Sequence, residues 1–286
     1  MLTLKALKKS MKTKYALGWV PDVPDVRDVP FSAVFRVPRQ APAAVDLRAG
    51  CSAVENQGAL GSCTAQALVG GLEFLQLRDL DRLGGVKGKS LPYRDLSRLF
   101  VYYNTRALMG TINEDSGAML RTGLKSLRKT GVCNEDLWPY VPERFAERPT
   151  PACFLAARGC RVKSYQRLAS LQEMKACLAA GLPFVFGFAV YEHVMTAETA
   201  RTGRIRLPRR NERMLGGHAV LAVGYHDRGA SLIFRNSWGV EWGRAGYGEI
   251  PYAYAESREL SDDFWCIQST FGGGGPARQG RGVGRP

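Results

Sequence analysis

The pattern of apolar positions divides the chain into a helical part and a strand-rich part. Apolar side chains recur at intervals of three and four from Ala65 to Leu75, which predicts a helix that begins at Cys63. The same spacing predicts helices over residues 96–108 and 117–130. From residue 184 to 190, every second side chain is Phe or Val, the pattern of a strand. Further strands are expected at 218–225, 231–235, 246–250 and 263–271.

These elements predict an α+β protein with two lobes. Residues 45–165 would form a mainly helical lobe that carries Cys63, and residues 166–271 a mainly β lobe that carries His218. A reaction that uses both side chains would take place in the cleft between the lobes. With 286 residues, 45% of them hydrophobic, the chain is long enough to bury a sizeable core. We expect a monomer.

Residues 1–44 lack long apolar periodicity and are rich in proline between positions 21 and 30, which favours an extended polyproline path. Such a path has three residues per turn, so three aspartates and three valines would each line one ridge. The ridges are Asp22, Asp25 and Asp28, and Val23, Val26 and Val29. We expect one ridge to dock on the protein while the other stays in water; a flexible linker is the alternative.

The net charge of +14 suggests an anionic partner, but eight of these charges lie in residues 1–14 and 272–286. The glycine-rich end, 272–286, is expected to be a flexible tail. One arginine cluster, between Arg201 and Arg213, is expected to be a solvated loop, with binding of a phosphate or acidic peptide as the alternative. A nucleic-acid binder would need aromatic residues among these arginines, and none are present.

Other composition features narrow the classes of protein. No run of about 18 apolar residues occurs, so no membrane span is expected. The N-terminus has no evident secretory signal, which leaves a cytoplasmic location or export by another route open. Seven cysteines without a Cys-x-x-Cys pair imply at least one free thiol, although Cys153 and Cys160 could pair across a loop. Three scattered histidines do not predict a metal site, and no cofactor is expected.

The candidate chemistry centres on Cys63. A helix N-terminus favours a thiolate, so we expect a lowered pKa for this cysteine. The amide of Gln57, six residues upstream, is a donor that suits an oxyanion. His218 opens one predicted strand and Asn236 follows the next, so an imidazole and an amide would lie close together. Such a pair can take the thiol proton and orient the ring.

These three blocks, Gln-x5-Cys, the strand-borne His218 and the Asn-Ser-Trp-Gly run from Asn236, resemble the papain-like cysteine peptidases over residues 45–271. The segments at residues 17–22 and 115–117 resemble a bacterial branch of that family. The resemblance implies a two-lobed papain-like fold with an antiparallel, barrel-like β lobe. Leu60 departs from the family pattern, because a disulfide-forming cysteine is common at this position.

The resemblance also implies the site. Cys63 would be the nucleophile, His218 the general base and then acid, and Asn236 the group that orients the ring. Gln57 and the Cys63 backbone N–H would form the oxyanion hole. Eight residues would bind substrate: Ser116, Gly117, Ala118, Met119, Gly187, Gly217, Ala219 and Trp238. Trp238 would also shield the contact between Asn236 and His218.

The resemblance further implies specificity and control. Ala118, Met119, Gly187 and Ala219 would line a roomy pocket for the second residue before the scissile bond, so a large hydrophobic side chain is expected there. The chain would be an endopeptidase on peptide or protein substrates. Residues 1–44 would be a short prosegment, with part of residues 20–42 covering or bordering the cleft until cleavage near residues 39–42 releases it. Alternatives are an acyl transferase of transglutaminase type on the same triad and a basic scaffold that binds a partner.

Overall fold

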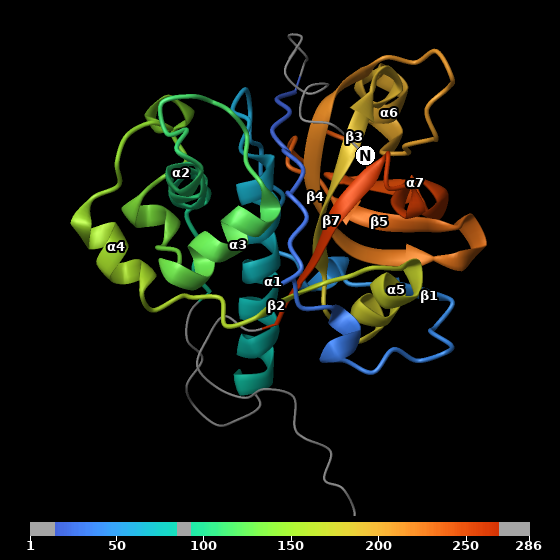
Figure 1. The fold of residues 1–286 in the computed structure, drawn as a ribbon, viewed down its shortest axis with the longest axis horizontal. Helices are drawn as coiled ribbons and strands as arrows, with labels where there is room; N and C mark the ends of the chain where they lie inside the picture. Colours follow the sequence, from blue (N-terminus) through green and yellow to red (C-terminus); the bar gives the residue numbers. More distant parts are fainter. Residues whose placement is uncertain (1–14, 85–92, 269–286) are drawn as a thin grey trace, which may run out of the picture.

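The structure, a computed structural model, describes residues 15–84 and 93–268. Helices and an antiparallel sheet stand side by side (Figure 1), so the predicted α+β fold with two lobes is confirmed. The basic stretch at residues 1–14, the predicted tail at 272–286 and the end of the last predicted strand lie outside the described residues.

Within the described residues, three long helices match the predicted ones, and four shorter helices have no counterpart in the prediction. The helices are α1 (Cys63–Gly84), α2 (Arg98–Met109), α3 (Leu120–Lys129), α4 (Pro151–Ala157), α5 (Leu171–Ala179), α6 (Ala197–Thr202) and α7 (Tyr252–Glu256). Gly110 ends α2 in the left-handed conformation, with a φ of 74°. Ser97 begins α2 by accepting the N–H of Phe100 with its side chain.

The described part of the chain contains one antiparallel sheet of seven strands. The strands are β1 (Ala44–Asp46), β2 (Tyr165–Arg167), β3 (Phe184–Tyr191), β4 (Met214–His226), β5 (Ser231–Arg235), β6 (Tyr247–Pro251) and β7 (Ser261–Ile267). Their order is β2-β7-β3-β4-β5-β6, with β1 paired to the C-terminal end of β4. The sheet is open rather than closed, so the β lobe resembles a barrel without being one.

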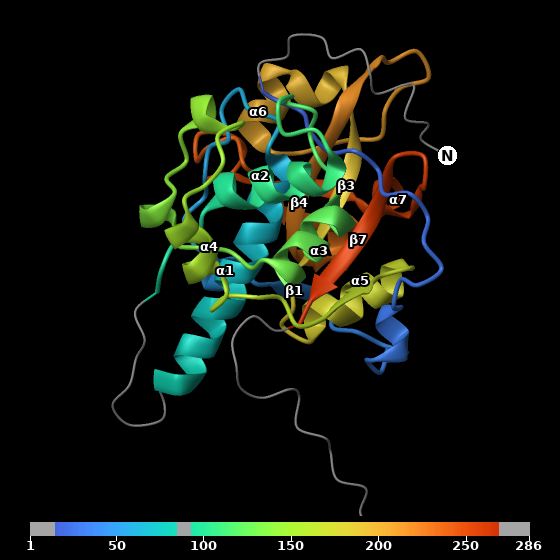
Figure 2. The same cartoon turned by 60° about the vertical axis from the view of Figure 1, so that its left-hand side comes forward.

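The core lies where α1 packs against β4 of the sheet on one side and against α2 and α3 on the other. The first part of α1 is apolar on nearly every side and buried throughout, as expected for a helix enclosed by both lobes. In Figure 2 the C-terminal end of α1 extends beyond the other elements. The helix therefore places its first residue, Cys63, at the junction of the lobes.

The N-terminal segment, residues 15–30, runs down this junction (Figure 1, blue). Its aspartate ridge faces the protein: Asp22 bonds the start of α3, and Asp28 pairs with Arg121. Its valine ridge faces water, and Val26 is fully exposed. The prediction of one docked ridge is met, and the docked ridge is the charged one because Arg121, which is buried, and Arg167, which is half-buried, offer it partners.

The described residues contain no helix with both the length and the apolar content that a membrane crossing requires. All seven cysteines lie among them, and every one is a free thiol. Cys153 and Cys160 are thus unpaired, and the disulfide that could have joined them is absent.

Candidate active site

Cys63 begins α1 and is completely buried. The loop before it is held by Asp115, whose two carboxylate oxygens accept the backbone N–H of Gly61 at 3.1 and 3.0 Å. Tyr102 of α2 donates its hydroxyl to the same carboxylate and accepts the N–H of Gly117 at 3.2 Å. One carboxylate and one phenol therefore tie the loop before Cys63 to the loop that begins the predicted substrate-binding wall.

Gln57 is fixed beside this loop by both ends of its amide. Its Oε1 accepts the hydroxyl of Ser237 at 2.6 Å, and its Nε2 donates to the carbonyl of Leu60 at 2.9 Å. The Nε2 group also donates to the carbonyl of Ala16, in the N-terminal segment, at 3.2 Å. The amide donor thus already holds a peptide carbonyl oxygen, the group that an oxyanion hole would bind.

His218 and Asn236 meet across neighbouring strands. His218 lies in β4, Asn236 follows β5, and His218 Nε2 is 2.8 Å from Asn236 Oδ1. The same Oδ1 accepts the backbone N–H of Ser237 at 2.9 Å, which supports the assignment of this atom as oxygen. Nε2 of the neutral ring must then carry the proton, which leaves Nδ1 as an acceptor. Nδ1 is buried and has no hydrogen-bond partner among the described residues.

Aromatic rings cover this pair. Trp238 stacks on His218 with ring centroids 4.4 Å apart, and Phe188 meets His218 edge-on at 5.7 Å. Tyr15 of the N-terminal segment stacks on Trp238 in turn, with ring centroids 4.5 Å apart and the rings within 6° of parallel. The imidazole is therefore oriented by one hydrogen bond and enclosed by rings that keep water away from it.

Burial holds both candidate reactive groups neutral. It raises the pKa of Cys63 to about 12, although backbone hydrogen bonds from Ala219, Gly18 and Thr64 act in the opposite direction. Burial also lowers the pKa of His218 to about 4, against the opposing effect of the bond to Asn236. The lowered cysteine pKa expected from the helix N-terminus is not found, because the covered thiol is shielded from water.

The N-terminal segment lies in the cleft and pairs with both walls. Trp19 donates its backbone N–H to Gly217 on the β side at 3.0 Å. On the helical side, Ala118 donates to Gly18 at 2.8 Å and accepts from Val20 at 3.0 Å. Residues 15–20 therefore cover the cleft. This covering segment begins five residues before the predicted range of 20–42 and shares only residue 20 with it.

Two glycines allow this close approach. A Cβ atom on Gly18 would lie 1.9 Å from the carbonyl oxygen of Gly61, and one on Gly117 would lie 2.3 Å from the carbonyl oxygen of Gly18. Gly117 also has a φ of 68°, a conformation that other residues adopt rarely. The segment therefore touches the loop before Cys63 backbone to backbone.

The side chain of Trp19 fills a pocket, defined here as the Trp19 pocket, whose walls include Gly187 and Gly217. A Cβ atom on Gly187 would fall 1.9 Å from the indole, and one on Gly217 would fall 2.8 Å from it. The indole N–H donates to Asp263 Oδ2 at 3.0 Å. The pocket therefore has small residues in its walls and carries a carboxylate beside the N–H edge of the indole.

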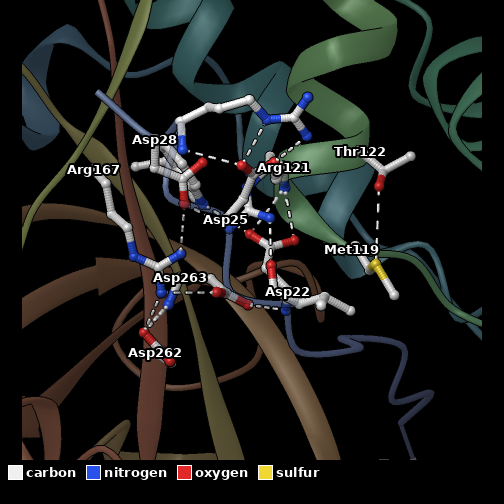
Figure 3. A network of polar contacts seen from close by, with 12 residues as sticks. Asp22, Asp25, Asp28, Met119, Arg121, Thr122, Arg167, Asp262 and Asp263 are labelled. Carbon is white, nitrogen blue, oxygen red and sulfur yellow. Dashed lines mark hydrogen bonds and ion pairs between the residues drawn. The ribbon is translucent and has the colours of Figure 1, made fainter. Parts of the chain in front are cut away.

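A network of aspartates and arginines anchors the segment after Trp19 (Figure 3). Asp22 accepts the indole N–H of Trp265 at 3.0 Å, and Arg121 pairs with Asp28 at 2.6 Å. Arg167 reaches Asp28 at 3.4 Å and Asp263 at 3.3 Å. Burial raises the pKa of Asp22, and it raises that of Asp263 with help from the nearby charge of Asp22.

The structure brings most of the predicted site residues together around residues 15–20. Ala118 and Gly217 bond to the segment, Gly187 faces Trp19, and Ala219 bonds to Cys63 through its backbone. Two predicted substrate-binding side chains bond elsewhere: the Ser116 hydroxyl donates to Thr111 and the Met119 sulfur accepts from Thr122.

Sequence reasoning missed several residues of the site. Tyr15, Trp19 and Asp115 lie in or beside the segments at residues 17–22 and 115–117, but the sequence predicts no role for them, and it predicts none for Asp263. The signal for Asp263 is present in the sequence, because two adjacent aspartates, the second and third residues of β7, directly precede the apolar part of the strand. Its meaning depends on which face of the sheet it takes, and the alternation of residues did not show this.

The described residues show no metal-binding group, and arginines of the basic cluster pair with glutamates. Among residues 15–84 and 93–268, no three His, Cys, Asp or Glu side chains are grouped to bind a metal ion. In the arginine cluster before His218, Arg206 pairs with Glu212 at 2.9 Å and Arg213 with Glu192 at 2.7 Å. A cavity of about 410 Å³ opens beside β1, β4 and β6, and none of the predicted site residues line it.

Comparison with protein families and curated proteins gives consistent matches. Residues 111–264 match the model described as papain family cysteine protease. An uncharacterized peptidase C1-like protein of Acanthamoeba polyphaga mimivirus is 38% identical over 222 residues, which are 74% of this chain and 68% of that protein. Mouse pro-cathepsin H is 28% identical over 68% of this chain; the matched part spans only 55% of that protein.

Comparison with solved structures agrees. Xylellain, a cysteine protease from Xylella fastidiosa, is 38% identical with a TM-score of 0.80, over 91% of this chain and 98% of that one. Procathepsin L 3 of Tenebrio molitor is 18% identical with a TM-score of 0.63, over 89% of this chain and 76% of that one, a likeness of fold.

Proposed function

The chain belongs to the papain family of cysteine proteases, and on that premise we propose that it is an endopeptidase that works through Cys63, His218 and Asn236. The observation that carries this proposal is the 2.8 Å bond from His218 Nε2 to Asn236 Oδ1. This bond fixes the tautomer of His218 in which Nδ1 can accept a proton. The next residue, Ala219, bonds the thiol of Cys63 through its backbone N–H, which places His218 near that thiol.

In the proposed reaction, Nδ1 of His218 takes the thiol proton and the sulfur of Cys63 attacks the peptide carbonyl carbon. The carbonyl oxygen becomes an oxyanion that accepts from Gln57 Nε2 and from the Cys63 backbone N–H, which has no partner within its helix. His218 then gives the proton to the departing amine as the C–N bond breaks, and the acyl group remains on Cys63 as a thioester. Water, deprotonated by the same imidazole, hydrolyses the thioester and frees the thiol.

We also propose that the chain is a zymogen in which residues 1–44 are the prosegment of a peptidase domain at 45–271. Residues 15–19 lie on the groups that a substrate would need: Tyr15 on Trp238, Ala16 on Gln57, and Gly18 on Cys63. The expected cleavage region supports this view, because Arg39 and Gln40 are exposed and open to a protease.

The proposal is tested with fluorogenic peptides and the full-length chain. Hydrolysis is expected in the wild type once the segment has opened or been cleaved, and is expected to be lost in Cys63→Ala. Cys51→Ala serves as the control, because Cys51 is a half-buried thiol outside the site. Product analysis with one equivalent of added amine per peptide separates the classes: a product that is mainly the amide of that amine, rather than the free acid, would indicate an acyl transferase. Full activity in Cys63→Ala would overturn the proposal.

A further inference from the structure

The Trp19 pocket differs from a purely apolar pocket because a carboxylate closes it. Trp19 is 2% exposed and Asp263 is not exposed at all, so the 3.0 Å bond from Trp19 Nε1 to Asp263 Oδ2 is made away from water. The same oxygen accepts the backbone N–H of Asp22 at 2.8 Å. Both donors of this oxygen belong to the N-terminal segment.

The backbone is distorted at Asp263. Its φ is 59°, a value that residues other than glycine rarely adopt. The pairing of β3 with β7 slips there: Val185 faces Trp265 and Gly187 faces Asp262, so β7 has one residue more than β3 in this interval. Such a bulge redirects a side chain, and strained conformations of this kind are concentrated at functional sites.

The pocket also has the shape for a large side chain. Gly187 and Gly217 both lack the Cβ atom that would collide with the indole. With small walls and a buried carboxylate beside the N–H edge of the indole, the pocket accommodates a long or bicyclic side chain and offers an acceptor to its N–H group.

We propose that Asp263 is a specificity-determining residue, which selects substrates whose side chain in the Trp19 pocket is large and ends in an N–H donor, as in tryptophan or arginine. This inference rests on the proposed function, because it requires a substrate residue to take the place of Trp19. It replaces the expectation of a large, purely hydrophobic side chain at this pocket.

The reason is the state of Asp263 once the segment has left. Oδ2 then loses the N–H groups of Trp19 and Asp22, whereas Oδ1 keeps Arg167 at 3.3 Å. A substrate side chain that fills the pocket shuts this oxygen off from water again, which is costly without a donor, and a side chain that supplies an N–H removes that cost. Phenylalanine, leucine or methionine would fill the pocket and leave the oxygen unpaired. The expected preference for the donor is about 10- to 100-fold in kcat/KM.

The test is competition between two peptides in one tube with the full-length chain. The peptides differ only at the tested position: one carries tryptophan and the other benzothienylalanine, in which sulfur replaces the N–H in a ring of similar shape. A second pair compares arginine with norleucine. Competition reports the ratio of kcat/KM values, which does not depend on the fraction of molecules whose cleft is open.

The variants sharpen this test. Asp263→Asn keeps an acceptor oxygen but removes the charge, so the arginine preference should disappear and the tryptophan preference should fall. Asp262→Asn removes the same charge one residue earlier, where the side chain is 40% exposed, and should keep both preferences. The wild-type peptide pairs need no variant, so the inference stays testable even if Asp263→Asn fails to fold.

Equal cleavage of tryptophan and benzothienylalanine by the wild type would overturn the inference, and so would an unchanged preference in Asp263→Asn. Either result would leave the proposed function standing, provided that Cys63→Ala abolishes cleavage of both peptides. Cleavage that persists in Cys63→Ala would instead contradict the proposed function.

Discussion

The N-terminal segment covers two clusters of residues that differ in charge: the neutral pair Cys63 and His218, and the charged pair Arg121 and Arg167. At Cys63 and His218 it excludes water and offers no countercharge, so the pKa values move to about 12 and about 4 and both groups stay neutral. A few residues later its own carboxylates enter the protein beside Arg121 and Arg167. The comparison teaches that burial suppresses reactivity at the first cluster, whereas paired charges at the second hold the segment in place.

The largest expected effect tests whether the neutral cluster is the reactive one. His218→Ala should lower kcat/KM about 10²- to 10⁴-fold, because the thiol proton then has no acceptor. The matched control is His193→Ala, which removes another buried histidine that bonds Glu212 outside the site. Peptide hydrolysis by the two variants is compared at one pH. A His218→Ala enzyme within threefold of the wild type would break the comparison.

The next effect concerns the charged cluster. Arg121→Met removes the pair with Asp28 and the donor to the carbonyl of Val23, so it should raise opening of the segment about 10- to 100-fold. Hydrogen exchange at the backbone N–H of Trp19, which bonds Gly217, measures that opening.

The control for Arg121→Met is Lys125→Met, the same change of charge on the same helix. Lys125 is 49% exposed and lies 3.9 Å from Asp25, so its loss should change exchange by less than twofold. If both variants open the segment equally, general charge and not the buried pair holds it.

The smallest predicted effect is the pH dependence of covering. The covered pKa of Cys63, about 12, lies above that of an ordinary thiol, so covering is fully stabilised below the uncovered pKa and weakens as the pH rises above it. Opening should increase about tenfold between pH 7.5 and 9.5 in the wild type. His218 contributes to the pH dependence of covering only at acidic pH, because burial lowers its covered pKa to about 4. As the pH falls below the pKa of the uncovered ring, protonation of that ring weakens covering.

Exchange at Trp19, corrected for the intrinsic pH dependence of amide exchange, measures this effect. Cys63→Ala lacks the thiol and should show no such increase. An equal increase in Cys63→Ala would mean that another group controls the opening.

Local pattern was enough to predict the elements that carry the site. The intervals of three and four after Cys63 specified α1, and the alternation from Phe184 specified β3, because each element buries a face whose period is visible in the sequence. The adjacency of His218 and Asn236 followed from two consecutive strands.

Features that depend on distant partners could not be predicted. The aspartate ridge docks on Arg121 and Arg167. These arginines lie far along the chain, and no residue near Asp22 in the sequence indicates that they will be its neighbours. The direction in which the Asp263 side chain points depends on a shift of register between β3 and β7. The raised pKa of Cys63 reverses the local effect of the helix terminus, because it depends on what covers the thiol.

The central claim is that residues 15–19 keep the thiol of Cys63 covered, and its alkylation rate tests this claim most directly. A Cβ atom on Gly18 would lie 1.9 Å from the carbonyl oxygen of Gly61, so Gly18→Ala should displace the segment. The rate at which an epoxide thiol reagent labels Cys63 is followed by mass spectrometry in both proteins, with the half-buried Cys51 as internal reference. We predict labelling of Cys63 at least tenfold faster in Gly18→Ala, with Cys51 unchanged; equal rates at Cys63 in the two proteins would contradict the account.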